Sequence, residues 1–386
     1  MYYPPYLPEE KIKILLSNEE KSLKQVEKIF KIQYYGKPRI FINISPFNMS
    51  WTDSAGIHYA APSSEFQKLT EEKYNNYIGR LHEWAHFLAL NLLCQERFIK
   101  PPSFFLIEGL ATAVDALIDA KYRINIHLIA KGLLKLGKLK QITKISNRDF
   151  LTFSTYEAGS FTLFLLENFG IEKLKEIYKY INDEENFKNH FKQIFGKSIS
   201  FFVEKWKAFL NSFLKDENKR ALYIAYASLS LDKMHPFVLE CEKFWILQGF
   251  RDLPDKIIKE EEKFYKAFFS LSQTFKLEYT YKNFSRTMDS FRVYLKKRQK
   301  SIKAFSKAKL LIKRGGEYKS IQNLLEYSLS LAVDIEDLEV IAKVYHYMDI
   351  ITLLRKSREA SKYNEKIKLL KKAEKEIILY KGVNYE

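Results

Sequence analysis

The stretch Leu81-His82-Glu83-Trp84-Ala85-His86-Phe87 decides how this 386-residue chain is interpreted. In an α-helix, side chains four residues apart lie on one face, about one turn apart, so His82 and His86 can bind the same metal ion. Glu83 lies between them, and its carboxylate can act as a base toward water on that ion. The competing interpretation is a structural helix with two incidental histidines.

The residues around this stretch predict a helix that follows a small sheet. From Thr70 to about Leu93, apolar residues recur at intervals of three and four, which indicates one long amphipathic helix. Upstream, Arg39–Ile44 and Gly56–Ala60 have the β-branched and aromatic composition of strands. We therefore expect a small sheet before the helix, with Gly56–Ala60 near its edge.

A third metal ligand is expected downstream, because catalytic zinc usually has three protein ligands. The segment Phe105-Leu106-Ile107-Glu108-Gly109-Leu110-Ala111 lies in a helix predicted over Ser103–Ala120. Burying the Glu108 carboxylate among these apolar residues is costly unless a cation compensates it. With two cysteines in the chain, a cysteine ligand is excluded by scarcity. The alternative is a surface glutamate near a helix start, where the helix dipole favours it.

These motifs resemble a known family. HEWAH (82–86) followed by IEGLATAVD (107–115) is similar to the gluzincin metallopeptidases, the clan of thermolysin and aminopeptidase N. Further on, YEAGSF (156–161) resembles the Y-E-x-G helix start of that clan. Residues 196–210 are similar to the closing helix of bacterial peptidase-MA-like domains. The four matches occur in the expected order and cover roughly residues 10–213.

The resemblance implies a role for each matched residue. His82, His86 and Glu108 would hold one zinc ion. Glu83 would take a proton from zinc-bound water and later deliver it to the leaving amine. Tyr156 would donate a hydrogen bond to the oxyanion that develops during attack on the peptide carbonyl.

A supporting acid is expected two helical turns after Glu108. Asp115 lies on the same helix face and is the expected hydrogen-bond acceptor for a ligand histidine, with Thr112 as a weaker candidate. The alternative for Asp115 is an ordinary exposed helix acid. His58, in the predicted edge strand, could face the cleft, but a packed or exposed histidine is the expected state.

One feature departs from the family. Aminopeptidases of this clan carry a G-x-M-E-N segment whose glutamate binds the free amine of the substrate. The segment before His82 reads GIHYAAPSSE instead. Amino-terminal trimming is therefore not expected, and an endopeptidase-like or specialised activity is favoured.

The composition divides the chain into two predicted domains. Residues 1–213 are expected to form an α+β, mostly helical, thermolysin-like domain. Residues 214–386 lack strand signals and are expected to form an all-α domain of helical hairpins, possibly repeat-like, that could bind a protein partner. The helices predicted there are Lys303–Lys313, Tyr318–Ala332, Ile335–Leu354 and Tyr363–Tyr380.

The net charge of +17 comes from 64 Lys and Arg against 47 Asp and Glu. Such a charge can attract nucleic acid, anionic lipid or acidic protein. Because Glu and Lys alternate along most of the helices, we expect a solvated surface and no nucleic-acid partner. No apolar run reaches the roughly 18–20 residues of a transmembrane helix. The location is cytoplasmic if Met1 is the native start, and exported if a leader was removed.

The sequence thus predicts a zinc-dependent peptidase acting on peptide or protein substrates. Two alternatives stay open. The first is a catalytically inactive binding protein that keeps the peptidase scaffold. The second is a basic, helical, nucleic-acid-associated protein whose residues 214–386 bind DNA or RNA.

Overall fold

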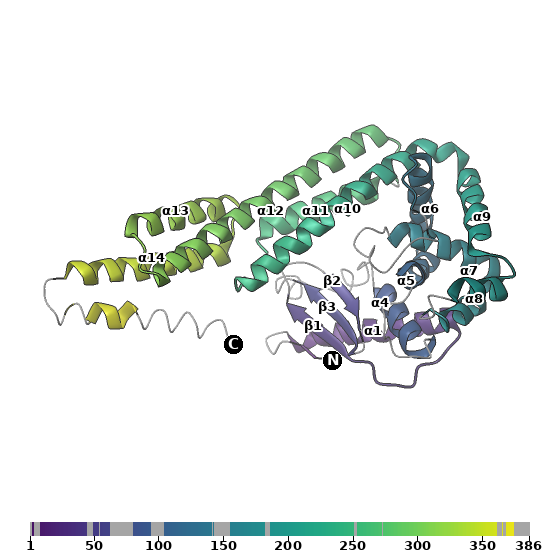
Figure 1. Ribbon diagram of the computed structural model, residues 1–386, viewed down its shortest axis with the longest axis horizontal. Coiled ribbons are helices and arrows are strands. Elements are labelled where there is room, and N and C mark those ends of the chain that lie inside the picture. The colour runs from purple at the N-terminus through teal and green to yellow at the C-terminus, as the bar shows by residue number, and fades with distance from the viewer. Residues whose placement is uncertain are drawn as a thin grey trace. The chain divides into compact units, whose positions relative to one another are not determined.

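The computed structural model describes residues 2–3, 8–44, 49–53, 55–61, 80–93, 104–140, 142, 155–181, 186–250, 253–271, 273–360, 365 and 368–373. The chain is mostly helical with one small sheet, which confirms the α+β class (Figure 1). It divides into two compact units. The first holds Met1–Ile44, Asn48–Pro236 and Ala267–Phe284, and the larger parts of the second are Phe237–Lys266 and Ser285–Glu386.

This division does not coincide with the boundary predicted after residue 213. Helix α10 (Asn218–Leu247) continues through Pro236 without a break, and its first half belongs to the first unit. That half passes so close to α6 (Ala120–Lys135) that no Cβ fits between Gly132 and the Ala221 carbonyl. The boundary between the two units is therefore set by packing between helices. The change in composition, after residue 213, comes earlier in the chain.

The N-terminal helix α1 spans Glu9–Phe30. Apolar positions at helical spacing are buried along the whole length of this helix. These positions are Ile12, Leu15, Val26 and Phe30.

The sheet has the order β1-β3-β2. Strand β3 (Ile57–Ala61) pairs in parallel with β1 (Ile40–Ile44) and antiparallel with β2 (Met49–Thr52), so it is central (Figure 1). The edge position predicted for Gly56–Ala60 is therefore wrong. The outer strands of the sheet are β1 and β2, and the four residues of β2 carry no strand pattern long enough to recognise. The backbone of Tyr2 pairs with the outer side of β1.

The motif helix α4 covers Arg80–Leu88, and a π-helical turn continues it through Ala89–Leu93. The predicted start of this helix, from Thr70 to Gly79, lies outside the described residues. The other helices of the first unit that precede α10 are α5 (Phe104–Ile118), α6, α7 (Thr155–Tyr178), α8 (Phe187–Phe195) and α9 (Ile199–Ser212). Helix α7 is interrupted at Gly170, where the backbone has a φ of 76°.

Helices α5 and α7 pack closely because two glycines face the partner helix. An ideal Cβ on Gly109 would lie 2.8 Å from the carbonyl oxygen of Ala158, and one on Gly159 would overlap the side chain of Thr112. A larger residue at either position would push the helices apart. This close approach fixes the part of α5 that carries Glu108.

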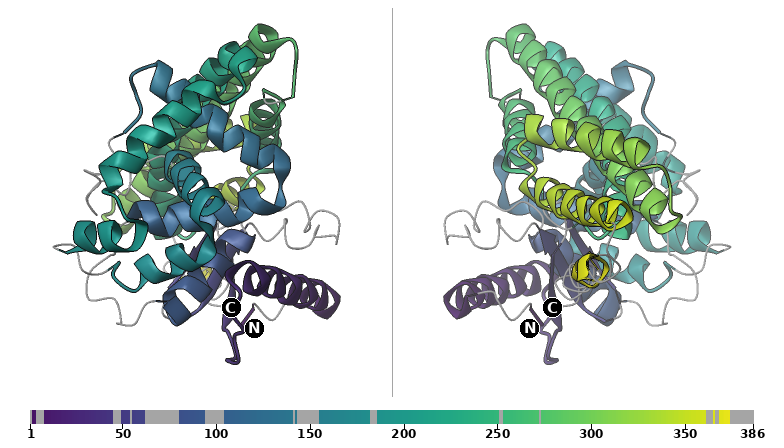
Figure 2. Two further views of the ribbon diagram at one scale, coloured as in Figure 1. Left: turned by 90° about the vertical axis from the view of Figure 1, so that its right-hand side faces the viewer. Right: turned by 90° about the vertical axis from the view of Figure 1, so that its left-hand side faces the viewer.

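The second unit contains helical hairpins. In it, part of α12 (Leu277–Lys313) packs against part of α11 (Asp255–Ser270), with stacked rings of Phe264 and Phe291. Helices α13 (Tyr318–Asp334) and α14 (Leu338–Glu359) lie side by side (Figure 2).

The C-terminal helix predictions meet different outcomes. The helix predicted over Tyr318–Ala332 is confirmed as α13, and Lys303–Lys313 is the end of the longer α12. Helix α14 begins at Leu338 rather than Ile335, because the side chain of Asp337 caps it. Most of Tyr363–Tyr380 lies outside the described residues. Among the helices that the structure describes, none combines the length and apolar character needed to span a membrane.

A buried carboxylate ties α1 to the sheet and to α4. Glu19 accepts hydrogen bonds from the indole nitrogen of Trp84 at 2.6 Å and from the hydroxyl of Tyr59 at 2.9 Å. Glu19 and Trp84 are almost completely buried. The motif helix α4 is therefore anchored to α1 through Trp84, which lies directly after Glu83 in the motif.

We expect Glu19→Ala to lower the free energy of unfolding by about 2–4 kcal/mol, because each buried donor left without an acceptor costs about 1–3 kcal/mol. Chemical denaturation followed by circular dichroism measures this loss. The matched control is Glu20→Ala, since Glu20 is the exposed neighbour in the same helix. Equal stability losses in the two variants would contradict the anchoring role.

Candidate metal centre

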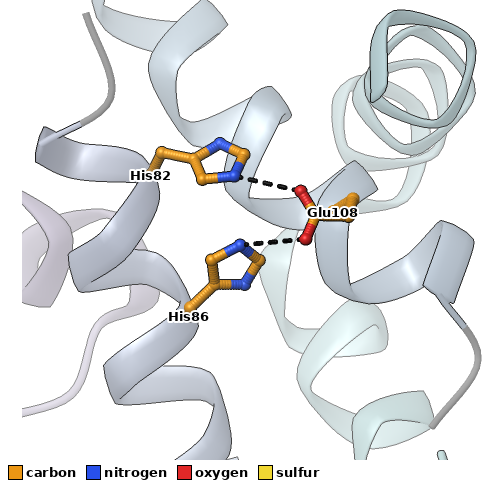
Figure 3. A group of neighbouring side chains, drawn as sticks. All are labelled: His82, His86 and Glu108. Carbon is orange, nitrogen blue, oxygen red and sulfur yellow. Dashed lines mark hydrogen bonds and ion pairs between the residues drawn. The ribbon is translucent and has the colours of Figure 1, made fainter. Parts of the chain in front are cut away.

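His82 and His86 project from one face of α4 toward α5 (Figure 3). Their ring centroids are 4.6 Å apart, with the rings nearly perpendicular. Glu108 of α5 lies opposite both of them. One of its carboxylate oxygens is 3.1 Å from Nε2 of His82, and the other is 3.4 Å from Nε2 of His86. The three residues predicted as ligands therefore converge.

The donor atoms lie close enough together to hold one metal ion. One ligand atom from each of the three residues lies within 4.8 Å of the others. Zn–N and Zn–O bonds of about 2.0–2.2 Å at tetrahedral angles place ligand atoms about 3.3–3.5 Å apart. The two measured histidine–carboxylate distances are close to this value. Two imidazoles and one carboxylate are also a donor set that catalytic zinc uses, with a fourth position left for water or substrate.

The electrostatics of the centre show how strongly its groups interact. Burial alone would lower the pKa of His82, but the hydrogen bond and charge of Glu108 outweigh it and raise that pKa to about 9. Burial would raise the pKa of Glu108, yet the two imidazoles hold it far below its usual value. The carboxylate is thus stabilised in its charged form, which is the form that binds a cation.

Asp115 lies on the far side of His82 from Glu108. Its carboxylate oxygen is 3.7 Å from Nδ1 of His82, within ion-pair distance and on the nitrogen that does not face Glu108. Burial raises the pKa of Asp115 to about 6, although the charges of His82 and His86 oppose the shift. Asp115 is therefore placed to orient the imidazole. Thr112 packs against Gly159 of α7 instead.

Glu83 is buried, with 4% of its surface exposed, and points toward the sheet. The hydroxyl of Thr52, the last residue of β2, donates a hydrogen bond of 2.8 Å to Oε2 of Glu83. The same hydroxyl lies 3.2 Å from the Glu83 carbonyl oxygen. Thr52 therefore holds the carboxylate in place. The sequence analysis did not identify Thr52, and a polar residue in a four-residue strand gives no signal that could have done so.

Two buried tyrosines lie beside each other, of which the sequence predicted one. Burial raises the pKa of Tyr156 to about 12, with a further contribution from the charge of Asp232. Burial also raises the pKa of Tyr122 well above its usual value, and the charges that add to this shift include Asp115 and Glu108. The two rings are 6.5 Å apart. Tyr122 thus experiences the carboxylates of the centre, and Tyr156 lies beside it.

A small hollow adjoins the two tyrosines within the first unit. Tyr122 and Tyr156 line it together with Ile129 of α6, Ile224 of α10 and Phe268 of α11. Most of this lining is apolar, which suits an apolar side chain better than a charged one. Its position beside Tyr156 brings it next to the face of α5 and α6 on which Asp115 and Tyr122 lie.

The remaining histidine and cysteine predictions have simple outcomes. The ring of His58 stacks on Phe41 of β1, with centroids 4.5 Å apart, and its Nε2 lies 3.2 Å from a carboxylate oxygen of Asp53. It is packed, as expected. Cys241 is buried and carries a free thiol. Cys94 lies outside the described residues.

Comparisons of the chain with family models, with curated proteins and with solved structures gave no match. The gluzincin assignment therefore stays a prediction from the motif residues, namely HEWAH, IEGLATAVD and YEAGSF. The geometry of His82, His86 and Glu108 stands apart from that assignment, because the distances between the three side chains involve no family comparison.

We expect the purified protein to bind one zinc ion per chain, and Glu108→Ala to lose it, because two histidines alone hold zinc weakly. Metal analysis after dialysis against a weak chelator measures the zinc content.

Asp115→Asn should keep the site but weaken zinc affinity about 10–100-fold, as the loss of an orienting acid does. The control is Glu172→Ala, which removes an exposed glutamate from α7. Wild-type protein that takes up no zinc would contradict the assignment of the centre.

Proposed function

We propose that the protein is a zinc-dependent peptidase that hydrolyses peptide bonds in peptide or protein substrates. The observation that carries the proposal is the convergence of His82, His86 and Glu108, together with a buried Glu83 whose carboxylate Thr52 holds by a hydrogen bond. A structural metal site needs ligands only. A buried glutamate between two ligand histidines, fixed by its own hydrogen bond, supplies the base that hydrolysis requires.

Zinc bound by the three ligands would polarise the substrate carbonyl and make water nucleophilic near neutral pH. The protein's own residues then carry the proton transfers. The carboxylate of Glu83 accepts the proton of the attacking water and gives it to the nitrogen of the leaving amine. Asp115 holds the imidazole of His82 in one orientation during these steps. Thr52 limits the motion of the Glu83 side chain.

The edge of the sheet supports a peptide as the substrate. An extended peptide can add to an edge strand through backbone hydrogen bonds. Strand β2 is the edge strand beside α4, and its last residue, Thr52, contacts Glu83. A peptide paired with β2 would therefore lead toward the three ligands. The segment GIHYAAPSSE lacks the G-x-M-E-N pattern that carries the amine-binding glutamate of aminopeptidases, so internal peptide bonds are the favoured targets.

A tyrosine is proposed to stabilise the oxyanion. The family resemblance assigns this role to Tyr156, and the charges around Tyr122 make it the second candidate. Burial keeps the hydroxyls of both residues protonated, which is the state that donates a hydrogen bond.

Glu83→Gln should keep one zinc ion and lose hydrolysis by at least a factor of about 10²–10⁴, which is the usual contribution of a positioned base. Zinc content and cleavage of a fluorogenic peptide library are measured on the same preparation. Wild-type protein that contains zinc but cleaves no peptide would favour the inactive-scaffold alternative. Full activity in the Gln variant would remove Glu83 from the reaction.

Replacement of Thr52 tests how the base is held. Thr52→Val has nearly the same shape but no hydroxyl, so we expect kcat to fall about 10–100-fold with little change in KM, the loss typical of one hydrogen bond to a charged group. Thr52→Ser keeps the hydroxyl and should restore most of the activity. Equal activity of the Val and Ser variants would show that the hydrogen bond does not matter for turnover.

A further inference from the structure

Helix α12, together with Arg314 in the turn directly after it, carries a line of exposed basic side chains in the second unit. The spacing between successive members is four, four, three, four and seven residues, so all lie within an arc of about 80° at 100° per residue. We call this line the basic stripe. Its members are Arg292, Lys296, Lys300, Lys303, Lys307 and Arg314.

The opposite face of α12 is buried, so the basic stripe faces away from the core of its unit. The buried residues on that face are Phe291, Leu295, Arg298, Ser301, Ile302 and Phe305. Two other basic residues of α12 lie off the stripe and have acidic partners. Lys297 pairs with Asp334, and Arg298 pairs with Asp337. Lys297 and Arg298 are therefore neutralised by acidic partners, whereas the basic stripe on the outer face of the helix carries only positive charge.

This arrangement differs from the solvated faces elsewhere in the unit. Helix α14 pairs opposite charges one turn apart, with Lys343 and Glu339 partly buried and Arg355 and Glu359 exposed. Between Phe291 and Gly316, by contrast, the sequence has ten basic residues and no acidic one. Like charges one turn apart repel and destabilise a helix. A solvated surface alone does not account for six of them in line.

Neighbouring groups hold the stripe without neutralising it. The guanidinium of Arg292 lies 5.9 Å from the ring centroid of Phe237, and the ammonium of Lys303 lies 5.7 Å from that of Phe244. These cation–π contacts leave the positive charge in place. On the adjacent part of α10, exposed Glu240 and Lys243 add no net charge.

We infer that the basic stripe binds the phosphate backbone of a nucleic acid. From Arg292 to Arg314 the stripe is about 33 Å long, at 1.5 Å per residue, with a cation about every 6 Å over most of its length. A nucleic acid presents charges of one sign at short, regular intervals over that distance, and releases bound counterions when Lys and Arg replace them. The inference is independent of the proposed peptidase activity.

The side chains of the stripe favour this partner over two others. A membrane-binding helix buries a broad apolar face beside its charges. Leu310 is the one exposed leucine that lies between the members of the basic stripe. An acidic polypeptide rarely matches a line of six cations with as many regular anions. The stripe has no aromatic side chain for stacking on bases, so binding should not depend on the base sequence.

The test uses the full chain, fluorescence anisotropy and labelled 20-base-pair DNA and RNA duplexes over 50–200 mM KCl. The stripe variant combines Lys296→Gln, Lys300→Gln and Lys307→Gln. A matched control changes three exposed lysines of the same unit that lie off the stripe. These are Lys259, Lys319 and Lys356, each changed to Gln. Thermal unfolding checks that both variants are folded, and both lose the same net charge.

With six phosphate contacts, wild-type affinity should fall about 2,000-fold between 50 and 200 mM salt, and with three contacts about 40-fold. We expect the stripe variant to show the smaller dependence and the control to behave as wild type. Binding of either duplex in this manner supports the inference and identifies which nucleic acid is preferred.

Three results would overturn it. The control variant could lose as much affinity as the stripe variant, or neither duplex could bind at 50 mM KCl. Alternatively, vesicles containing phosphatidylserine, or poly-glutamate, could bind more tightly than both duplexes and lose binding in the stripe variant. That last result would assign the stripe to a membrane or to an acidic protein.

Discussion

A carboxylate placed between two imidazoles sets the main energetic condition on the first unit. Charge that is removed from water must be compensated, and Glu108 is compensated by His82 and His86, at 3.1 and 3.4 Å. This requires α4 and α5 to keep a fixed separation and rotation. The glycine contacts between α5 and α7 hold one side of the pair, and the hydrogen bond from Trp84 to Glu19 holds the other.

The part of the centre that follows from helical periodicity could be predicted from the sequence. The spacing of His82 and His86 is local, and the relation of Asp115 to Glu108 is a matter of two turns in one helix. Thr52 could not be found in this way, because its contact with Glu83 joins residues 31 positions apart through a strand of four residues. Tyr122 was missed for a similar reason, since its position depends on how α6 crosses α5.

Strand order and unit boundaries depend on pairing between distant segments, and the sequence predicted them less well. Strand β3 has the composition expected of a strand, but composition does not tell a central strand from an edge strand. The total charge of the chain likewise did not predict how the charged residues are distributed over the helices. Opposite charges pair along α14, as the sequence predicted. In α12, by contrast, one set of basic residues pairs with acidic residues, and the basic stripe forms a separate set on the outer face.

The hydrogen bond between Glu19 and Trp84 has a practical consequence for truncation of the chain. Because α1 supplies the acceptor for an indole in the motif helix, a shortened protein beginning after Phe30 would leave that indole without its partner and expose apolar core residues. Helix α1 is thus an integral part of the first unit, and shortened versions of the protein should retain it.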